Sequence, residues 1–479
     1  MRSKLSRIII KGGVLSPAEL KNIGITAESL GLNAISFGSR QDILFPNKAA
    51  VDKLSELNGL QVVNDQTNRI ENIVSSYVSV DIFSSTNWLT SDRYLYILEK
   101  FRYQPKLKIN ITDPKQRLVP LFTGHLNFIA SVHEDYWYLY IRLPEWKNNL
   151  SYPALIYSWD IARVSQEIEK ILQEEPEDTE TVFHLVNEVI DGNNRTIDKP
   201  LDVPFLPFPY YEGMNRLGID KYWLGLYWRN NKYDITFLKA MCDLCAECKI
   251  GKISITPWKS FIVKGIPVEA KLDWEKFLGK FGINVRHSLL ELNWHLPVDN
   301  HEALELKQFL VSNFDKKDIS TYGLTFCIKD YSQKGYYFTS IIIQKNKPLE
   351  IAEDFNIRDT YNLLYAKNFN PNTREYIVYV QDVDKVELPG LLMEMSKMYF
   401  EQLGTFKENK EVEAKKETFA LKVHQCKDCL TIYDPTFGDI TQNIEPNTSF
   451  DALPDNYECP LCEAPKSNFE KKTLAKQVD

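Results

Sequence analysis

The sequence predicts an α+β protein with a large duplicated body and a small metal-stabilised domain near its C-terminal end. Three observations support this fold class. Residues 7–45 combine short β-branched apolar runs with one helical segment, a similar pattern returns about 220 residues later, and two Cys-x-x-Cys pairs lie close to the end of the chain. Similarity at a fixed long period indicates an internal duplication.

The composition is that of a well-packed globular protein. The chain has 479 residues, of which 44% are hydrophobic and 12% aromatic, and this length predicts two to four domains. A net charge of −8 argues against nucleic acid as a partner. The first residues do not resemble a signal peptide, and no segment approaches the roughly twenty apolar residues of a membrane helix. The eight cysteines suggest no disulfide framework, so we expect a reducing cytoplasm and no membrane association.

The first repeat begins at residue 7. Ser16 is a predicted N-cap, Pro17 takes the first helical position, and Glu19 completes a capping box. Gly12 and Gly13 are expected to form a turn before this helix. The predicted elements are a strand at 8–10, a helix from about 16 to 31, and strands at 34–37 and 43–45, with a polar corner at 39–41.

The second repeat follows the same order. A helix is expected from Asp234 to Cys248, then strands at 252–255 and 261–263. The corner at 256–259 takes the place of the corner at 39–41. This match predicts that the two segments fold alike.

Cys242, Cys245 and Cys248 form a Cys-x-x-Cys-x-x-Cys motif, which would suit an iron–sulfur site. At 100° per residue, however, the three sulfur atoms spread over about 120° of one helix face. Apolar side chains share that helix, namely Phe237, Leu238, Met241 and Leu244. We therefore interpret the three cysteines as small core residues.

The C-terminal pairs are Cys426/Cys429 and Cys459/Cys462. Four thiolates close a tetrahedral site that selects zinc or iron. A domain of about fifty residues needs such a metal, because its apolar core is too small. The residues between and after the pairs resemble rubredoxin, notably Tyr433-Asp434-Pro435, Gly438-Asp439, Ile444 to Phe450, Leu453-Pro454 and Lys466 to Phe469.

The rubredoxin resemblance implies one iron held by the four cysteines, which cycles between ferric and ferrous without catalysis. The alternative is a zinc ribbon, which has no need of these intervening residues. Leu430 and Glu463 stand where rubredoxins usually carry Gly, at a cost of roughly 1–2 kcal/mol each if these positions require positive φ. Tyr457 replaces a usual Trp. Asn447 replaces a usual Gly, and Asn tolerates the left-handed region.

The body shows a second resemblance. Residues 7–45 look like the ferredoxin-like half-domain of sirohaem nitrite and sulfite reductases, and residues 105–129 are similar to that family's first α/β lobe. The resemblance implies a pseudo-twofold arrangement with a cofactor cleft between two lobes. The predicted domains are a first half-domain at 1–75, a first lobe at 76–205, a second half-domain at 206–285, a second lobe at 286–405, a charged linker at 406–420, and the rubredoxin domain at 421–472.

The cysteines required for that family's chemistry are missing. The family holds a 4Fe–4S cluster, which bridges to sirohaem iron, in a C-x5-C group and a C-x3-C group. The first group would fall at 292–297, where no Cys occurs, and the second keeps only Cys327, with Tyr331 at the bridging position. One cysteine cannot hold a four-iron cluster, so neither sirohaem nor 4Fe–4S is expected.

The family also grips its anionic substrate with four basic residues. Arg40, Lys106 and Lys108 match three of them, whereas the fourth falls near Glu71, two residues from Arg69. A carboxylate there would repel an anion. Two readings stay open, ordinary surface or cleft charge, or a residual anion or tetrapyrrole cleft. No catalytic residue is assigned.

The sequence thus predicts an electron-transfer protein. Its Fe(Cys)4 centre would serve a redox partner, a reductase or an oxidase, with the degenerate body as a docking scaffold. The resemblance makes nitrite or sulfite assimilation the expected context. From 421 to 479 there are 10 acids and 6 bases, a net charge of −4, which predicts a basic patch on the partner. The alternatives are a tetrapyrrole-binding reductase-like enzyme fed by its own rubredoxin, and a pure interaction subunit.

Overall fold

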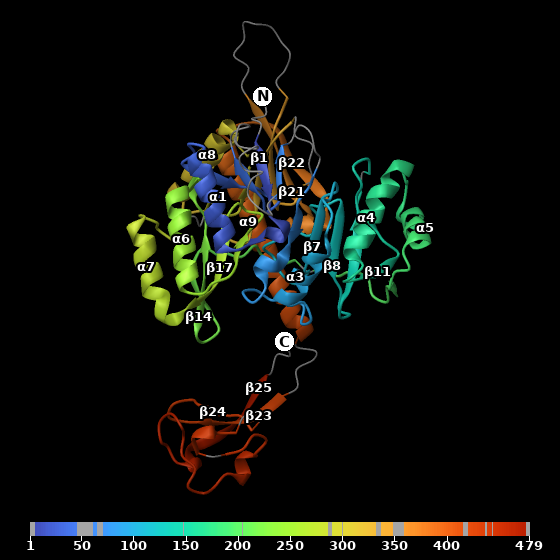
Figure 1. Ribbon diagram of the computed structural model, residues 1–479. Helices are drawn as coiled ribbons and strands as arrows, with labels where there is room; N and C mark the ends of the chain where they lie inside the picture. Colours follow the sequence, from blue (N-terminus) through green and yellow to red (C-terminus); the bar gives the residue numbers. More distant parts are fainter. Residues whose placement is uncertain are drawn as a thin grey trace. The chain divides into compact units, whose positions relative to one another are not determined.

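The structure is a computed structural model (Figure 1). It describes residues 5–45, 61–64, 70–146, 148–203, 205–285, 290–298, 300–331, 337–347, 359–414, 420–435, 438–442 and 444–475. The chain divides into two compact units, Met1–Ser396, called the body here, and Lys397–Asp479, called the C-terminal unit. No helix in these ranges is both long and apolar enough to cross a membrane.

Two five-stranded sheets form the duplicated part of the body, and each sheet borrows a short strand from the other half. The first has the order β15-β3-β4-β1-β5, with bounds β1 Ser6–Ile9, β3 Ala34–Phe37, β4 Ile43–Phe45, β5 Gln61–Asn64 and β15 Tyr233–Asp234. The second has the order β13-β14-β17-β16-β2, with bounds β2 Val14–Leu15, β13 Gly213–Leu217, β14 Lys221–Leu226, β16 Ile253–Ile255 and β17 Phe261–Pro267. The exchange of β2 and β15 links the two half-domains through backbone hydrogen bonds.

The two half-domains also share one hydrophobic core. In it Phe37 from the first half packs on Tyr233 from the second, with ring centroids 4.5 Å apart. Because these side chains leave water together, neither half-domain buries its apolar face alone. This explains why the helices of the two halves lie side by side.

Helices α1 (Pro17–Ser29) and α6 (Ile235–Glu247) are those equivalent helices. The predicted capping box is present, since the Ser16 hydroxyl accepts from the Glu19 N–H and the Glu19 carboxylate accepts from the Ser16 N–H. Cys242 and Cys245 are buried in the shared core, as predicted, and Cys248 packs against it. Burial raises the pKa of the Cys242 thiol to about 12, so it stays protonated at neutral pH.

The two corners are built alike, which confirms the predicted duplication. The Gly38 N–H donates to the Asp42 carbonyl at 2.8 Å, and the Thr256 N–H donates to the Ser260 carbonyl at 2.9 Å. In Gly38–Asp42 and Thr256–Ser260 the fourth residue is left-handed, with φ +60° at Gln41 and +59° at Lys259. Arg40 and Trp258 are therefore equivalent positions.

Each half-domain is followed by a mixed α/β lobe (Figure 1). The first lobe has a seven-stranded sheet of β6 Ile73–Ser75, β7 Ile109–Thr112, β8 Leu126–Ala130, β9 Tyr136–Ile141, β10 Leu150–Ser151, β11 Ala154–Tyr157 and β12 Arg195–Thr196. Its helices are α3 Ser91–Lys100, α4 Ile161–Ile171 and α5 Thr179–Val189. Strands β6, β7 and β8 are parallel, and β9 is antiparallel to β8.

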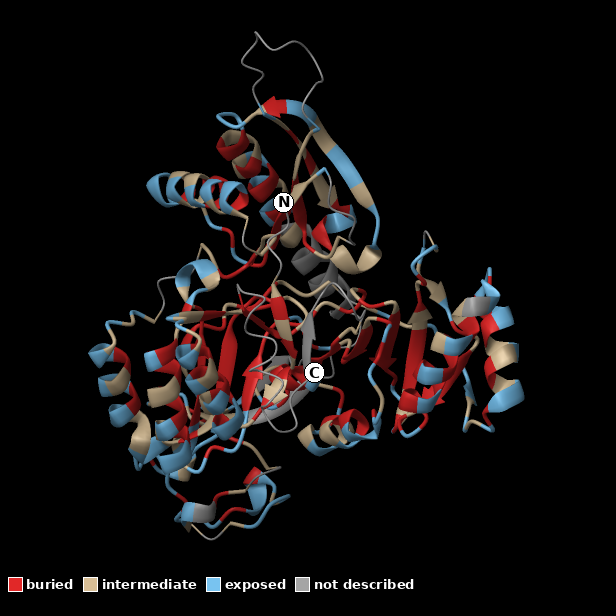
Figure 2. Cartoon of the chain, turned by 45° about the horizontal axis from the view of Figure 1, so that its top comes forward, coloured by how far each residue is buried: buried red, intermediate tan, exposed pale blue. Residues whose placement is uncertain are grey.

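The second lobe repeats this pattern. Its sheet contains β18 Trp294–His295, β19 Phe326–Asp330, β20 Ile341–Lys345, β21 Thr360–Ala366 and β22 Tyr376–Asp384. Helix α8 His301–Lys316 follows β18, whereas α7 Lys271–Lys280 packs on the shared core of the half-domains through Trp274 and Leu278. Strands β18, β19 and β20 are parallel, and β21 is antiparallel. Buried residues line the central strands of the body's sheets, whereas the edge strands β12 and β22 and the outer faces of the helices are largely exposed (Figure 2).

Helix α9 (Leu388–Ala414) enters the segment that was predicted to be a charged linker. Residues 407–414 are rich in Lys and Glu, which have high helix propensity and so allow the helix to continue. Residues 415–419 lie outside the described residues. A helix can also connect two units, so the linker and the other domain limits stay predictions.

The C-terminal unit contains a three-stranded sheet in the order β24-β23-β25, with bounds β23 Ala420–Cys426, β24 Ile432–Tyr433 and β25 Phe469–Ala475. Its core is aromatic, as predicted. Phe450 packs on Phe469 with centroids 5.2 Å apart, and Tyr433 packs edge-on against Tyr457 at 5.8 Å. This core holds the backbone on which the four cysteines sit.

Candidate metal centre

The four predicted cysteines converge in the C-terminal unit. The sulfur atoms of Cys426, Cys429, Cys459 and Cys462 all lie within 4.8 Å of one another. The Cys426–Cys462 sulfur pair is 3.6 Å apart, and the Cys429–Cys459 pair is 3.4 Å apart. A tetrahedral ion with metal–sulfur bonds of about 2.3 Å sets its sulfurs ~3.8 Å apart, so the donor set fits such an ion. No other group of three or more metal-binding side chains occurs in the part of the chain that the structure describes.

Each cysteine pair closes a tight turn of the same geometry. The Leu430 N–H donates to the Cys426 carbonyl at 3.0 Å, and the Glu463 N–H donates to the Cys459 carbonyl at 2.8 Å. Leu430 has φ +63° and Glu463 has φ +59°. These values confirm that both positions require the left-handed conformation, which costs a residue with a Cβ atom roughly 1–2 kcal/mol relative to Gly.

The centre is buried on one side and open on the other. Cys426 and Cys459 are buried, Cys429 is half-buried and Cys462 is exposed. The hydroxyl and backbone N–H of Thr431 hydrogen-bond to the Cys429 sulfur and lower the pKa of that thiol to about 6. This favours the thiolate, which is the form that binds a metal. Sequence reasoning missed Thr431, although a hydroxyl residue two positions after a metal-binding Cys was a signal for it.

Residues between the two cysteine pairs form a hydrogen-bonded network around the aromatic core. Asp439 accepts from the Tyr457 hydroxyl at 3.1 Å and from the Thr441 N–H at 2.9 Å. The Tyr433 hydroxyl donates to the Thr448 carbonyl at 2.8 Å. Asn447 has φ +68°, the conformation for which Asn substitutes well for Gly. The polar ends of the aromatic core are thus satisfied.

Comparison with known proteins agrees with this geometry. The family model described as Rubredoxin matches residues 423–469. The C-terminal domain is a rubredoxin. It is 48% identical over 46 residues to Rubredoxin-1 of Chlorobaculum tepidum, covering 10% of this chain and 67% of the relative. It is 51% identical over 45 residues to the probable rubredoxin HupI of Bradyrhizobium diazoefficiens, covering 9% and 65%.

A third relative is the probable rubredoxin HupJ of Rhodobacter capsulatus, 47% identical over 49 residues, which are 10% of this chain and 18% of the relative. The chain therefore spans between 18% and 67% of the length of these three proteins. The rubredoxin domain supports a role in electron transfer with a redox partner and supports one bound iron.

The body resembles a solved structure, that of the NirA protein of Mycobacterium tuberculosis. The TM-score is 0.61 at 16% sequence identity, and the match covers 81% of this chain and 79% of the other. This confirms the fold that the sequence resemblance implied for the body. At this identity the likeness concerns the fold alone.

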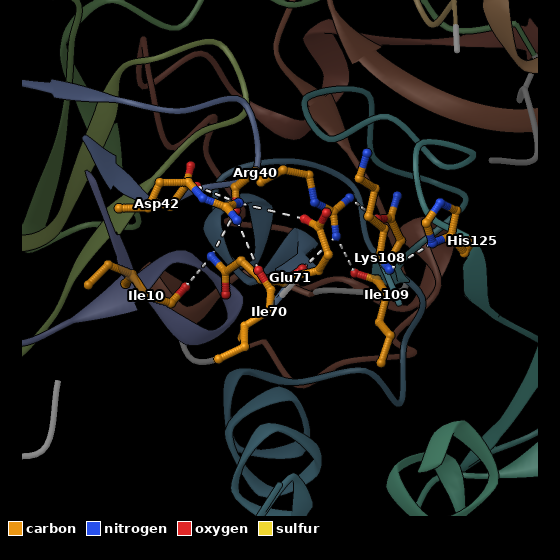
Figure 3. A network of polar contacts seen from close by, with 11 residues as sticks. Ile10, Arg40, Asp42, Ile70, Glu71, Lys108, Ile109 and His125 are labelled. Carbon is orange, nitrogen blue, oxygen red and sulfur yellow. Dashed lines mark hydrogen bonds and ion pairs between the residues drawn. The ribbon is translucent and has the colours of Figure 1, made fainter. Parts of the chain in front are cut away.

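Arg40, the first of the predicted basic residues, is bound within the body (Figure 3). Its Nη1 donates to the Asn110 Oδ1 at 2.7 Å, and its Nη2 donates to the carbonyls of Asn72 at 2.6 Å and Ile109 at 2.9 Å. Desolvation by burial lowers the pKa of Arg40 to about 10, so the guanidinium stays charged at neutral pH. The two terminal nitrogens of Arg40 therefore form hydrogen bonds that join the first half-domain to the first lobe.

Glu71 belongs to the same network. Arg7 lies between two carboxylates, with its Nη1 3.6 Å from Glu71 Oε2 and 3.6 Å from Asp42 Oδ2. Burial raises the pKa of Asp42, although the nearby Arg7 opposes this shift. Glu71, which stands at the family's fourth basic position, is therefore paired with Arg7 within the body. Arg69, two residues away, lies outside the described residues.

Lys108 lies beside this network, and Lys106 is exposed. The backbone N–H of Lys108 donates to the His125 Nδ1 at 3.1 Å (Figure 3). Burial, and then the positive charge of Lys108, lowers the pKa of His125 to about 3, so this imidazole is neutral. The Lys106 N–H is held by Glu169 at 2.8 Å. The structure thus brings Arg40 and Lys108 into one basic region, while Lys106 faces solvent.

The positions expected for cluster cysteines lie on neighbouring strands. His295 of β18 is the register partner of Cys327 of β19. Burial raises the pKa of Cys327 to about 12. Nearby, the amine of Lys259 donates to the carbonyl of Leu296. The segments 292–297 and 327–331 therefore lie side by side, and Cys327 is the one cysteine within them.

One pocket lies between the two lobes. A pocket of about 60 Å³ is lined by Phe122 of the first lobe, Trp258 of the second half-domain, and Tyr337 and Phe338 of the second lobe, among others. Arg374 of the second lobe stacks on Phe122, with its guanidinium carbon 4.6 Å from the ring centroid. Aromatic side chains thus line this part of the junction between the two lobes.

Proposed function

We propose that this protein is an electron carrier that holds one iron through Cys426, Cys429, Cys459 and Cys462. The single observation that carries the proposal is the convergence of these four sulfur atoms within 4.8 Å in a rubredoxin domain. Bound iron would supply one-electron ferric/ferrous chemistry. Cys426 and Cys459 anchor the centre in the aromatic core, and the more exposed Cys429 and Cys462 face the side from which a partner approaches.

The surface beside the exposed cysteines suits a transient partner. Leu430 is 61% exposed and Leu461 is 73% exposed, and each lies next to one of those cysteines in the sequence. Such apolar side chains exclude water when a partner docks. The net charge of −4 over residues 421–479 favours a basic partner, so electron transfer should slow as the ionic strength rises.

The body would act as a docking scaffold that has lost reductase chemistry. Three observations support this part of the proposal. The outer nitrogens of Arg40 are used internally. The 292–297 segment has no cysteine. Among the described residues, the pocket that Phe122, Trp258 and Phe338 line is about 60 Å³, below the ~300–1,000 Å³ of sites that enclose drug-sized ligands. Nitrite or sulfite assimilation is the proposed context, and the cysteine content favours the cytoplasm.

The deciding experiment is a cofactor analysis of the full chain, purified from its native host or from a host that makes sirohaem. One iron per chain, no acid-labile sulfide and no tetrapyrrole absorption are expected. Zinc in place of iron in natively produced protein would overturn the redox assignment and favour an interaction subunit with a structural metal.

The fold that the body shares with NirA, in a match covering 81% of the chain, favours a second candidate function. In this candidate the body still binds a tetrapyrrole, through a ligand other than a cluster thiolate, and receives electrons from its own rubredoxin. A tetrapyrrole band in the natively produced protein would favour it and would contradict the inert scaffold.

A further inference from the structure

The two cysteine turns of the rubredoxin domain have the same backbone geometry. The Cys426 N–H donates to the Thr431 carbonyl at 2.8 Å, and the Cys459 N–H donates to the Ala464 carbonyl at 2.8 Å. Thr431 and Ala464 thus hold the same place, each two residues after the second cysteine of its pair. One has a hydroxyl and the other has only a methyl group.

The hydroxyl makes the two halves of the centre unequal. Thr431 Oγ1 lies 3.0 Å from the Cys429 sulfur. Two hydrogen bonds fix the backbone of Thr431. The Thr431 carbonyl accepts from the Cys426 N–H, and the preceding Leu430 carbonyl accepts from the side-chain amide of Gln425 at 2.8 Å. The left-handed φ of +63° at Leu430 directs the chain back toward the sulfur. Cys462 has no equivalent hydroxyl, because Ala464 stands at that place.

We propose that Thr431 donates a hydrogen bond to the metal-bound sulfur of Cys429 and thereby raises the reduction potential of the centre. This inference rests on the proposed function. A metal-bound thiolate has no proton to give, so the hydroxyl must be the donor. Adding one electron increases the negative charge on the sulfurs, so the donor stabilises the reduced form more than the oxidised form. No proton is transferred, and the hydroxyl hydrogen stays on Oγ1. Thr431 is thus a positioning and tuning residue.

The test is the midpoint potential of the full-length iron-loaded protein in which Thr431→Val replaces the hydroxyl with a methyl group of similar size. We expect reduction to become about tenfold less favourable, a shift of ~59 mV to lower potential for one electron. Thr431→Ser should stay close to the wild-type potential. The matched control is Thr448→Val, because the Thr448 hydroxyl donates to the Glu445 carbonyl and not to a sulfur.

A second variant tests the asymmetry itself. Ala464→Ser adds a hydroxyl at the equivalent place beside Cys462, so we expect a shift to higher potential. Equal potentials for wild type, Thr431→Val and Thr448→Val would overturn the inference. Failure of the proposed function looks different, because the protein would then carry zinc or show no reversible ferric/ferrous couple at all.

Discussion

Gln41 and Lys259 occupy the same place in the two halves of the body, each in the left-handed conformation at the fourth position of its corner. The Gln41 amide donates to the carbonyl of Ser75 at 3.0 Å, at the end of β6. The Lys259 amine donates to the carbonyl of Leu296, directly after β18. The duplication therefore preserves the bond to the lobe but replaces a neutral donor with a charged one.

This difference predicts a pH-dependent stability. Burial lowers the pKa of Lys259 to about 8, below the 10.5 expected for a free lysine. Between these values the unfolded chain binds more protons, so stability rises with pH across this window. In Lys259→Met this contribution disappears. The free energy of unfolding of the variant, relative to that of the wild type, should therefore be highest below pH 8. This difference should fall by roughly 3 kcal/mol by pH 10.5, because the wild type gains that stability across the window.

Thermal and urea unfolding at pH 7, 8.5 and 10 would measure this effect. Lys106→Met is the control for the removal of a lysine, because Lys106 is exposed and Lys259 is buried. Lys259→Met also loses the hydrogen bond to Leu296, and it does so at every pH. This loss changes the free energy of unfolding by the same amount at each pH and leaves its slope against pH unchanged. A stability difference that does not vary with pH would contradict the prediction.

Arg40→Met should destabilise the body. The substitution leaves the Asn110 Oδ1 and the carbonyls of Asn72 and Ile109 without their donor, and it removes a positive charge beside Glu71 and Asp42. Losing a charged partner of buried polar groups costs about 2–4 kcal/mol. Lys106→Met at neutral pH should stay within about 0.5 kcal/mol of wild type. Urea unfolding followed by tryptophan fluorescence compares the two, and equal effects would mean that the Arg40 contacts contribute little.

Cys426→Ser or Cys462→Ser should abolish the red chromophore of the iron-loaded protein. Either change removes one of four ligands, and the small C-terminal unit depends on the metal for stability. We expect proteolysis to cut residues 421–472 while the body stays resistant. Cys248→Ser is the control, since this thiol packs on the body core and should leave the spectrum unchanged. Unfolding of the body in Cys426→Ser would show that the two units are not independent.

Leu430→Gly should stabilise the rubredoxin domain. Leu430 has φ +63°, so Gly relieves roughly 1 kcal/mol of backbone strain, and the side chain is 61% exposed, so little apolar burial is lost. The temperature at which the chromophore is lost should rise. Leu461→Gly is the matched control, because Leu461 is also exposed but is not left-handed, and its replacement by Gly should lower that temperature. A fall in both variants would mean that Leu430 is not strained.

The sequence by itself determined the features that depend on short-range signals. The capping box at Ser16 and Glu19, the repeated corners, and the apolar face around Cys242 and Cys245 were all predicted, because each is written within a few residues. The four metal-binding cysteines were predicted for the same reason. A Cys-x-x-Cys turn is a local structure, and only two such turns had to meet.

The tertiary structure alone decided which distant groups satisfy one another. The exchange of β2 and β15 between sheets joins residues 198 to 240 positions apart. Arg40 finds its acceptors 32 to 70 residues away, so its basic character in the sequence did not reveal that it is bound internally. The Thr431 hydroxyl reaches the Cys429 sulfur only because a left-handed Leu430 turns the chain. Backbone propensity and motif spacing do not encode such contacts, because they arise when packing fixes side-chain directions in three dimensions.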